Sequence, residues 1–280
     1  MWHNTAMLAY RLLGQQLVPL QNTSSNFDEL TSQLPHGLYS TFITNHGGTR
    51  VPGLTAHLDR LYVPAEEHGL PPSASRADLR RALASLASSS PGAESRFRVI
   101  LSESDGTVYV MVQGFTPLSK EIYERGVKVI TADLTRHDPR LKDSAFITES
   151  RSARAKVGGD VFEVLLTHRG KIYEGMTSNF YIVRQIGNPP RLITARKGIL
   201  LGVTRRAVLR LARGQGMEIE YRFPRLDETF SEAFLTSSSR GVVPIVQVDD
   251  RVVGEGRVGA WTKRLASAYQ AYVEERSEKI

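Results

Sequence analysis

The chain has 280 residues, enough for one large domain or two smaller ones with a substantial core. Its 41% hydrophobic and 23% charged residues are typical of a globular protein, and the absence of cysteine excludes disulfides, thiolate nucleophiles and cysteine metal sites. The net charge of +7 does not indicate a nucleic-acid partner, because basic and acidic residues are interspersed without long runs of one sign.

The first residues do not resemble a targeting segment. Residues 1–5 carry no positive charge, and the stretch 6–18 is interrupted by Tyr10, Arg11 and two glutamines. We therefore expect no signal peptide and no membrane span, with the cytoplasm as the location.

Short alternating stretches and turn signals predict a mixture of strands and helices in the first 119 residues. Ser75 is a plausible N-cap for an amphipathic helix. The expected elements are a strand over 38–43, a turn over 45–48, a helix starting near 54, a helix over 76–87, a strand pair over 96–102 and 107–115, and an interdomain linker over 116–119.

The remaining residues continue this mixture. The expected elements are a strand over 127–132, a helix over 144–157, a hairpin of 161–167 with 171–173, a strand over 180–184, a helix over 202–215, strands over 233–236, 242–248 and 251–253, and a helix over 259–275. No strict strand–helix–strand rhythm appears, so the pattern predicts an α+β protein. We expect a small N-terminal α+β domain over 1–118 and a larger C-terminal one over 119–280.

Residues 173–183 (YEGMTSNFYIV) place one carboxylate, Glu174, in an apolar hairpin just before a small polar turn. A buried carboxylate is costly unless a positive or proton-bearing group meets it. A structural ion pair is one such partner, and the protonated ring nitrogen of a pyridine cofactor is another. The residues themselves leave both interpretations open.

Lysine chemistry is the natural companion of a pyridine cofactor, because a lysine amine can condense with its carbonyl. Lys142 lies just ahead of the predicted helix over 144–157, in the segment 138–144 (DPRLKDS). Taken alone, such a lysine is usually a solvated surface residue.

Four segments together carry a more specific pattern: Lys142, residues 158–166 (GGDVFEVLL), 170–175 (GKIYEG) and 177–180 (TSNF). This pattern resembles the class IV aminotransferases, the fold-type IV pyridoxal-phosphate enzymes. They include branched-chain and D-amino-acid transaminases and aminodeoxychorismate lyase. The resemblance extends from about residue 38 to 259 and is strongest over 142–245.

The resemblance implies pyridoxal 5′-phosphate as cofactor, bound between the two domains, and a cofactor role for several residues. Lys142 would form a Schiff base with it and move the proton between the substrate α-carbon and the cofactor. Glu174 would meet the pyridine nitrogen and keep it protonated, so that the ring withdraws electrons. The phosphate would be bound by Arg60 with support from His57, by the backbone of Val203 and Thr204 at a helix N-terminus, and by Ser238.

The substrate side departs from the family pattern. The strand at 39–43 (YSTFI) lacks the family's usual glutamate and arginine, and Phe146 and Ile147 stand where many branched-chain enzymes have a tyrosine that holds the phenolic oxygen. Arg136 is a candidate for that task, by resemblance to an arginine ahead of the lysine in D-amino-acid transaminases. Tyr39 is a candidate pocket wall, Ser239 a candidate substrate contact, and Arg136, Arg140 and Arg240 are candidate carboxylate clamps.

The resemblance therefore predicts a transaminase that acts on an amino acid or amine and a 2-oxo acid, as a homodimer. Two rivals remain. Ser40 and Thr41 resemble the hydroxyl pair of the lyases, and a non-catalytic anion-binding relative would keep the same fold. The histidines show no metal-ligand spacing, so we expect no metal site. From the charge pattern and the first residues described above, we also expect no nucleic-acid partner and no membrane partner.

Overall fold

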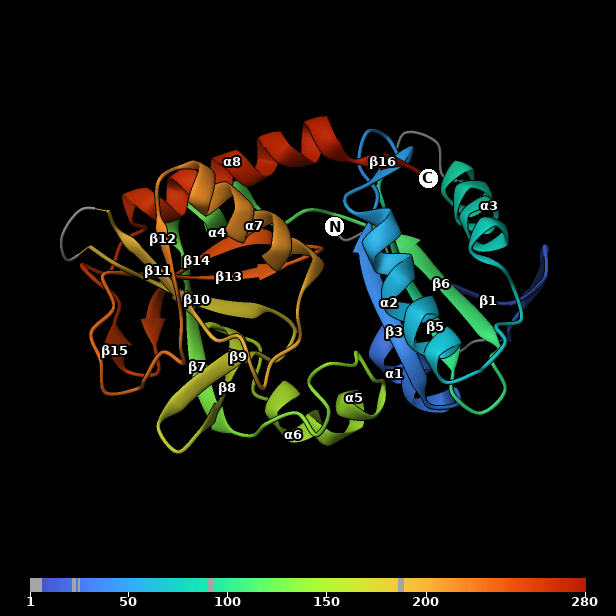
Figure 1. Ribbon diagram of the computed structural model, residues 1–280, viewed down its shortest axis with the longest axis horizontal. Helices are drawn as coiled ribbons and strands as arrows, with labels where there is room; N and C mark the ends of the chain where they lie inside the picture. The colour runs from blue at the N-terminus through green and yellow to red at the C-terminus, as the bar shows by residue number, and fades with distance from the viewer. Residues whose placement is uncertain (1–6, 22–23, 25, 90–92, 186–188) are drawn as a thin grey trace. The chain divides into compact units, whose positions relative to one another are not determined.

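The computed structural model describes residues 7–21, 24, 26–89, 93–185 and 189–280, and their helices and strands are drawn in Figure 1. They form two compact units. The first comprises the described residues up to Thr116 together with Leu141–Thr148 and Val273–Ile280; the second comprises Pro117–Arg140 and those of Glu149–Tyr272. The domain ranges 1–118 and 119–280 stay a prediction, and Lys142 is counted with the first unit.

An antiparallel sheet forms the centre of the first unit, with the strand order β2-β1-β6-β5-β3. The predicted strands and both predicted helices are confirmed; β1, β2 and α1 were not predicted. The elements are β1 (Leu8–Leu13), β2 (Gln16–Pro19), α1 (Phe27–Gln33), β3 (Gly37–Ile43), β4 (Arg50–Val51), α2 (Leu54–Glu67), α3 (Arg76–Ser88), β5 (Ser95–Ser102), β6 (Val108–Gly114) and β16 (Glu278–Lys279), which pairs with β4.

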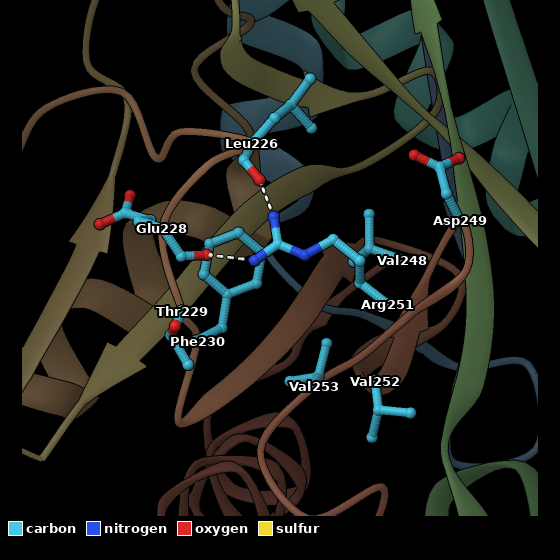
Figure 2. A pocket seen from close by; sticks show the side chains of 9 residues that line it. All are labelled: Leu226, Glu228, Thr229, Phe230, Val248, Asp249, Arg251, Val252 and Val253. Atoms are coloured by element: carbon cyan, nitrogen blue, oxygen red, sulfur yellow. Dashed lines mark hydrogen bonds between the residues drawn. The ribbon is translucent and has the colours of Figure 1, made fainter.

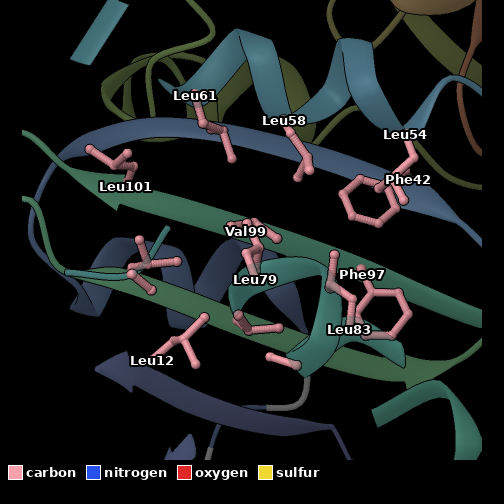
Figure 3. Close-up of a cluster of buried hydrophobic side chains, with 14 of the residues drawn as sticks. Leu12, Phe42, Leu54, Leu58, Leu61, Leu79, Leu83, Phe97, Val99 and Leu101 are labelled. Carbon is pink, nitrogen blue, oxygen red and sulfur yellow. The ribbon is translucent and has the colours of Figure 1, made fainter. Parts of the chain in front are cut away.

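Helices α2 and α3 contribute to the main apolar core of this unit, which Figure 3 shows over one face of the sheet. Leu58 and Leu83 from the helices belong to the same buried cluster as Phe42 and Phe97 from the strands. Side chains alternate along a strand, so Tyr39 belongs to a different cluster, with Phe27 of α1. On strand β3, Leu38 and Phe42 therefore point to one face of the sheet and Tyr39 points to the other.

A larger mixed sheet forms the second unit, in the order β12-β11-β10-β13-β14-β7-β8-β9, with β15 paired to β14. Strand β9 also contacts β10, so the sheet curves round on itself. The elements are α4 (Lys120–Arg125), β7 (Val127–Asp133), α6 (Arg151–Arg154), β8 (Val161–His168), β9 (Lys171–Gly175), β10 (Asn179–Arg184), β11 (Arg191–Thr194), α7 (Val203–Gly214), β12 (Glu218–Tyr221), β13 (Glu232–Ser237), β14 (Gly241–Val248), β15 (Arg251–Val252) and α8 (Ala260–Arg276), whose last residues, from Val273, belong to the first unit.

One predicted helix is wrong. Residues 144–157 form two short helices, α5 (Ala145–Glu149) and α6, because Ser150 leaves helical geometry at φ −88° and ψ 9°. Serine competes with the helix for backbone hydrogen bonds and favours caps, and the residues after Ile147 are too polar to continue an apolar face. Among the described residues, the helices all fall short of the length and apolar character that crossing a membrane requires.

Candidate active site

Glu174 lies in β9 and is only 2% exposed. Arg136 Nε donates to its Oε1 at 2.7 Å, Asn179 Nδ2 donates to Oε2 at 3.2 Å, and the Leu200 N–H reaches both oxygens at 3.1–3.2 Å. A carboxylate with this set of donors is stable in its charged form despite its burial. The structural ion pair that the sequence left open is therefore present, and its partner is Arg136.

The β8–β9 hairpin places this carboxylate. Its turn uses Arg169 and Gly170, both with positive φ, and Ile172 and Glu174 then share the buried face of β9. Arg136 follows β7, and its second nitrogen donates to the Met176 carbonyl at 2.9 Å. Its guanidinium thus joins the segment after β7 to Glu174 and to the start of the turn that follows β9.

The loop before α7 is held against Glu174 by Asn179. The side-chain amide of Asn179 donates to the Leu200 carbonyl at 2.7 Å as well as to Glu174. A Cβ at Gly202 would lie 2.3 Å from Asn179 Oδ1, so this close approach requires glycine. Helix α7 starts at the next residue, Val203, and its first N–H groups have no acceptor within the helix.

Thr204, in the first turn of α7, is buried, and its hydroxyl lies 3.3 Å from the hydroxyl of Tyr269 in α8. Burial raises the pKa of Tyr269, although the hydrogen bond to Thr204 acts in the opposite direction, so the phenol stays protonated. The ring of Tyr269 also packs against Gly241, where an added Cβ would lie 3.3 Å from it. One tyrosine therefore contacts both α7 and the start of β14.

The turn between β13 and β14 carries the predicted residues Ser238, Ser239 and Arg240, all half-buried. Arg240 donates through Nε to Ser237 Oγ at 3.0 Å and through its terminal nitrogen to Glu163 at 2.8 Å. In the second unit, then, three predicted segments are linked by contacts: the end of β9, the start of α7 and this turn.

In the first unit, Lys142 lies beside β3. The Tyr39 N–H donates to the Lys142 carbonyl at 2.8 Å, and Leu38 forms an isolated antiparallel β-bridge with Asp143. The backbone of the lysine segment therefore pairs with the start of β3. The Lys142 ammonium lies 4.6 Å from the centre of the Tyr39 ring, within the range of a cation–π contact. Two predicted site residues are therefore neighbours.

Sequence reasoning missed Arg98, which lies near the same ring. Its guanidinium is 5.0 Å from the centre of Tyr39 and is bound by Asp28 of α1 at 2.7 Å. Arg98 is only 5% exposed. Arg98 lies between the core residues Phe97 and Val99 on one strand, so its side chain points to the opposite face of the sheet, where Tyr39 lies. This alternation is the one sequence signal that would have placed it there.

Arg60 and His57 lie one turn apart on α2, Arg60 half-buried and His57 fully buried. His57 Nδ1 and Ser40 Oγ are 2.8 Å apart and hydrogen-bonded. The Ser40 hydroxyl, which suggested a lyase, thus serves to hold His57. Thr41 Oγ1 likewise accepts from Arg98 Nε at 3.1 Å.

Three further expectations concern groups outside these contacts. Phe146 and Ile147 are buried apolar side chains, so neither supplies a hydroxyl. Arg140 is exposed. Within the described residues, no three His, Asp or Glu side chains gather in a way that would hold a metal ion.

A separate pocket of the second unit contains none of the predicted residues. Figure 2 shows the Arg251 guanidinium crossing it to the carbonyls of Leu226 and Glu228, with Phe230 and Val253 among its apolar walls. Its own arginine side chain spans this pocket, so it is not a candidate for the predicted chemistry.

The groups described above suit pyridoxal phosphate. The start of α7, with the Thr204 hydroxyl, and the hydroxyl of Ser238 are donors of the kind that bind a phosphate. Glu174 is a buried carboxylate suited to a pyridine nitrogen, and Lys142 is an amine of the kind that condenses with the cofactor carbonyl.

Comparison with known proteins agrees with this chemistry. The model of the class IV aminotransferase family matches residues 37–248. A branched-chain-amino-acid aminotransferase of Pseudomonas aeruginosa is 29% identical over 255 residues, covering 82% of this chain and 81% of the relative. A D-alanine aminotransferase of Bacillus licheniformis is 28% identical over 246 residues, covering 78% and 81%.

The fold agrees as well. The crystal structure of a Thermotoga maritima protein, provisionally assigned as a branched-chain amino acid aminotransferase, superimposes with a TM-score of 0.80 at 26% identity over 96% of each chain. The α+β fold expected from the sequence is confirmed. Because the family model covers most of the chain, this protein belongs to the class IV aminotransferases and is a pyridoxal-phosphate-dependent transaminase.

Proposed function

We propose that this transaminase moves the amino group of an aliphatic amino acid to a 2-oxo acid, with Lys142 as the reacting amine. The substrate class is supported by its relatives, which are named for branched-chain amino acids and for D-alanine. Bound pyridoxal phosphate would supply the carbonyl that accepts the amino group and the ring that withdraws electrons from the α-carbon.

The residues of the chain would divide the work as follows. Lys142 Nζ would hold the cofactor and then carry the α-proton, and Glu174 would keep the pyridine nitrogen protonated. The phosphate would be bound by Arg60, by the N–H groups of Val203 and Thr204, and by Ser238.

The substrate contacts are proposed separately. Tyr39 and Ser239 would line the amino-acid site, while Arg136 would act through Glu174 because its Nε already binds that carboxylate. The observation that carries the proposal is the burial of Glu174 beside the loop that leads into α7, where Arg136, Asn179 and the Leu200 N–H donate to it.

The direct test is Lys142→Ala. The purified wild-type protein with added pyridoxal phosphate should show a visible absorption band that borohydride removes, and the variant should lack both the band and turnover. Full activity of the variant would refute the role of Lys142. A panel of L- and D-amino acids and (R)-amines against several 2-oxo acids would then identify the donor and its enantiomer.

The same assay separates transfer from elimination. Turnover that depends on a 2-oxo acid acceptor supports the transaminase, whereas release of pyruvate without an acceptor would revive the lyase. The Ser40 hydroxyl does not support the lyase, because it is fully buried and hydrogen-bonded to His57.

We also propose that the enzyme works as a homodimer in the cytoplasm, as the family resemblance predicts. Light scattering coupled to size-exclusion chromatography would measure a mass of twice 31.1 kDa for the dimer. A monomer that retains full turnover would contradict it.

A further inference from the structure

Arg240 is one of the candidate clamps for a substrate carboxylate, but in the structure a carboxylate of the protein already binds it. Its terminal nitrogen lies 2.8 Å from Glu163 Oε2 and 2.5 Å from Thr177 Oγ1, and its Nε donates to Ser237 at 3.0 Å. The guanidinium also lies 5.2 Å from the centre of the Phe162 ring. Each of these contacts is made within the second unit.

Loss of the ion pair would cost Glu163 more than Arg240, because Glu163 is the more deeply buried of the two. It points inward from β8 and is 1% exposed, whereas Arg240 is half-buried. Besides Arg240, its Oε2 accepts from Thr177 Oγ1 at 2.7 Å and from Ser178 Oγ at 3.3 Å. A carboxylate this deeply buried is strongly destabilised when its positive partner is removed, so the pair resists separation.

The pair joins two turns that the proposed function requires. Thr177 and Ser178 follow Glu174 by three and four residues, and Ser238 lies two residues before Arg240. The first turn is tightly packed, because a Cβ at Gly175 would lie 2.1 Å from Ser178 Oγ and 3.3 Å from Glu163 Cγ. The second turn is held from its other side by the Tyr123 hydroxyl, which donates to the Arg240 carbonyl at 2.9 Å.

We propose that Arg240 is a positioning residue, and that its ion pair with Glu163 sets the distance between the pyridine-nitrogen carboxylate and the phosphate hydroxyl of Ser238. The inference rests on the proposed function of these two groups. It assigns Arg240 to the cofactor and not to the substrate carboxylate, because its Nε and one terminal nitrogen are already bound to Ser237, Glu163 and Thr177.

Two variants distinguish positioning from clamping. Glu163→Gln keeps the shape and the hydroxyl contacts of the side chain but removes its charge, and Arg240→Met removes the guanidinium. Under positioning, both should raise the dissociation constant of pyridoxal phosphate by about tenfold or more, the effect of losing a hydrogen bond to a charged group, with the KM of the amino donor nearly unchanged.

Under clamping, the two variants would move in opposite directions. Arg240→Met would raise the KM of the amino donor while the cofactor affinity stayed the same, and Glu163→Gln would release the guanidinium and lower that KM. This pattern would overturn the inference, as would unchanged cofactor affinity in Glu163→Gln. If Arg240→Met does not fold, Glu163→Gln alone decides.

The matched control is Arg257→Met, which removes an arginine from an exposed pair with Glu255. It should leave both the cofactor affinity and KM at the wild-type values. Cofactor binding is read from the absorption band of the wild type. If the wild-type protein itself takes up no cofactor, the proposed function has failed. If the wild type binds the cofactor and the variants bind it equally well, only the positioning role of Arg240 has failed.

Discussion

The chain buries several carboxylates, and each of them meets a different set of donors. Glu174 is bound by Arg136, Asn179 and a backbone N–H, and Glu163 is bound by Arg240 and two hydroxyls. Glu232 accepts from two N–H groups and a hydroxyl at the start of α8. Burial alone therefore does not mark a catalytic carboxylate; its neighbours do.

Glu174→Gln tests the catalytic role without creating a cavity. The amide retains an oxygen for Arg136, so the variant should fold and should still attach the cofactor through Lys142. It carries no negative charge to keep the pyridine nitrogen protonated, so kcat should fall by about 100-fold or more. Steady-state kinetics with the absorption spectrum would measure both quantities. Wild-type kcat would contradict the role.

At the scale of elements, the start of α7 has to satisfy two structural requirements at once. It approaches Asn179 closely, and its first N–H groups have no acceptor within the helix, which suits the proposed binding of an anion. Gly202 permits the approach although its φ of −62° is open to any residue, so the requirement is for space and not for conformation.

Gly202→Ala and Gly214→Ala form a matched pair in the same element. The first places a methyl group 2.3 Å from Asn179 Oδ1 and should move that side chain off Glu174, weakening cofactor binding and lowering stability. The second meets no atom within 4 Å near the end of the helix and should stabilise the protein by up to about 1 kcal/mol. Urea unfolding and cofactor titration would compare them, and equal behaviour of the two variants would contradict the steric argument.

At the scale of the molecule, the predicted cofactor groups are distributed over both compact units. Lys142 and Arg60 belong to the first, while Glu174, Thr204 and Ser238 belong to the second. Each unit has its own apolar core. A ligand that binds the folded chain and not the unfolded chain stabilises the fold by mass action.

Removing pyridoxal phosphate should therefore lower the melting temperature. At a free concentration 100 times its dissociation constant, the cofactor should contribute about 2.7 kcal/mol to the free energy of unfolding. Lys142→Ala should reduce this gain, because the covalent link is lost. Calorimetry with and without cofactor would measure it, and identical melting curves for the wild type would show that the cofactor does not bind.

Much of the fold followed from local patterns. The strand β3, the capped helix α3 and the β8–β9 hairpin were predicted, because periodicity and turn residues act over a few positions. The split of residues 144–157 into two helices was not predicted, nor were β1, β2, β11 and β12, since short segments gain their stability from the neighbours they pair with.

The sequence by itself determined the family and the kind of cofactor, because the residue types and their spacing around Lys142 and Glu174 are properties of the chain. Only the tertiary structure decided which groups these residues meet. Arg136 is 38 residues from Glu174, and Arg240 is 77 residues from Glu163. Such pairs depend on strand order and on the curvature of the sheet, which no local pattern encodes. They give two of the predicted clamps a carboxylate of the protein as partner: Glu174 for Arg136 and Glu163 for Arg240.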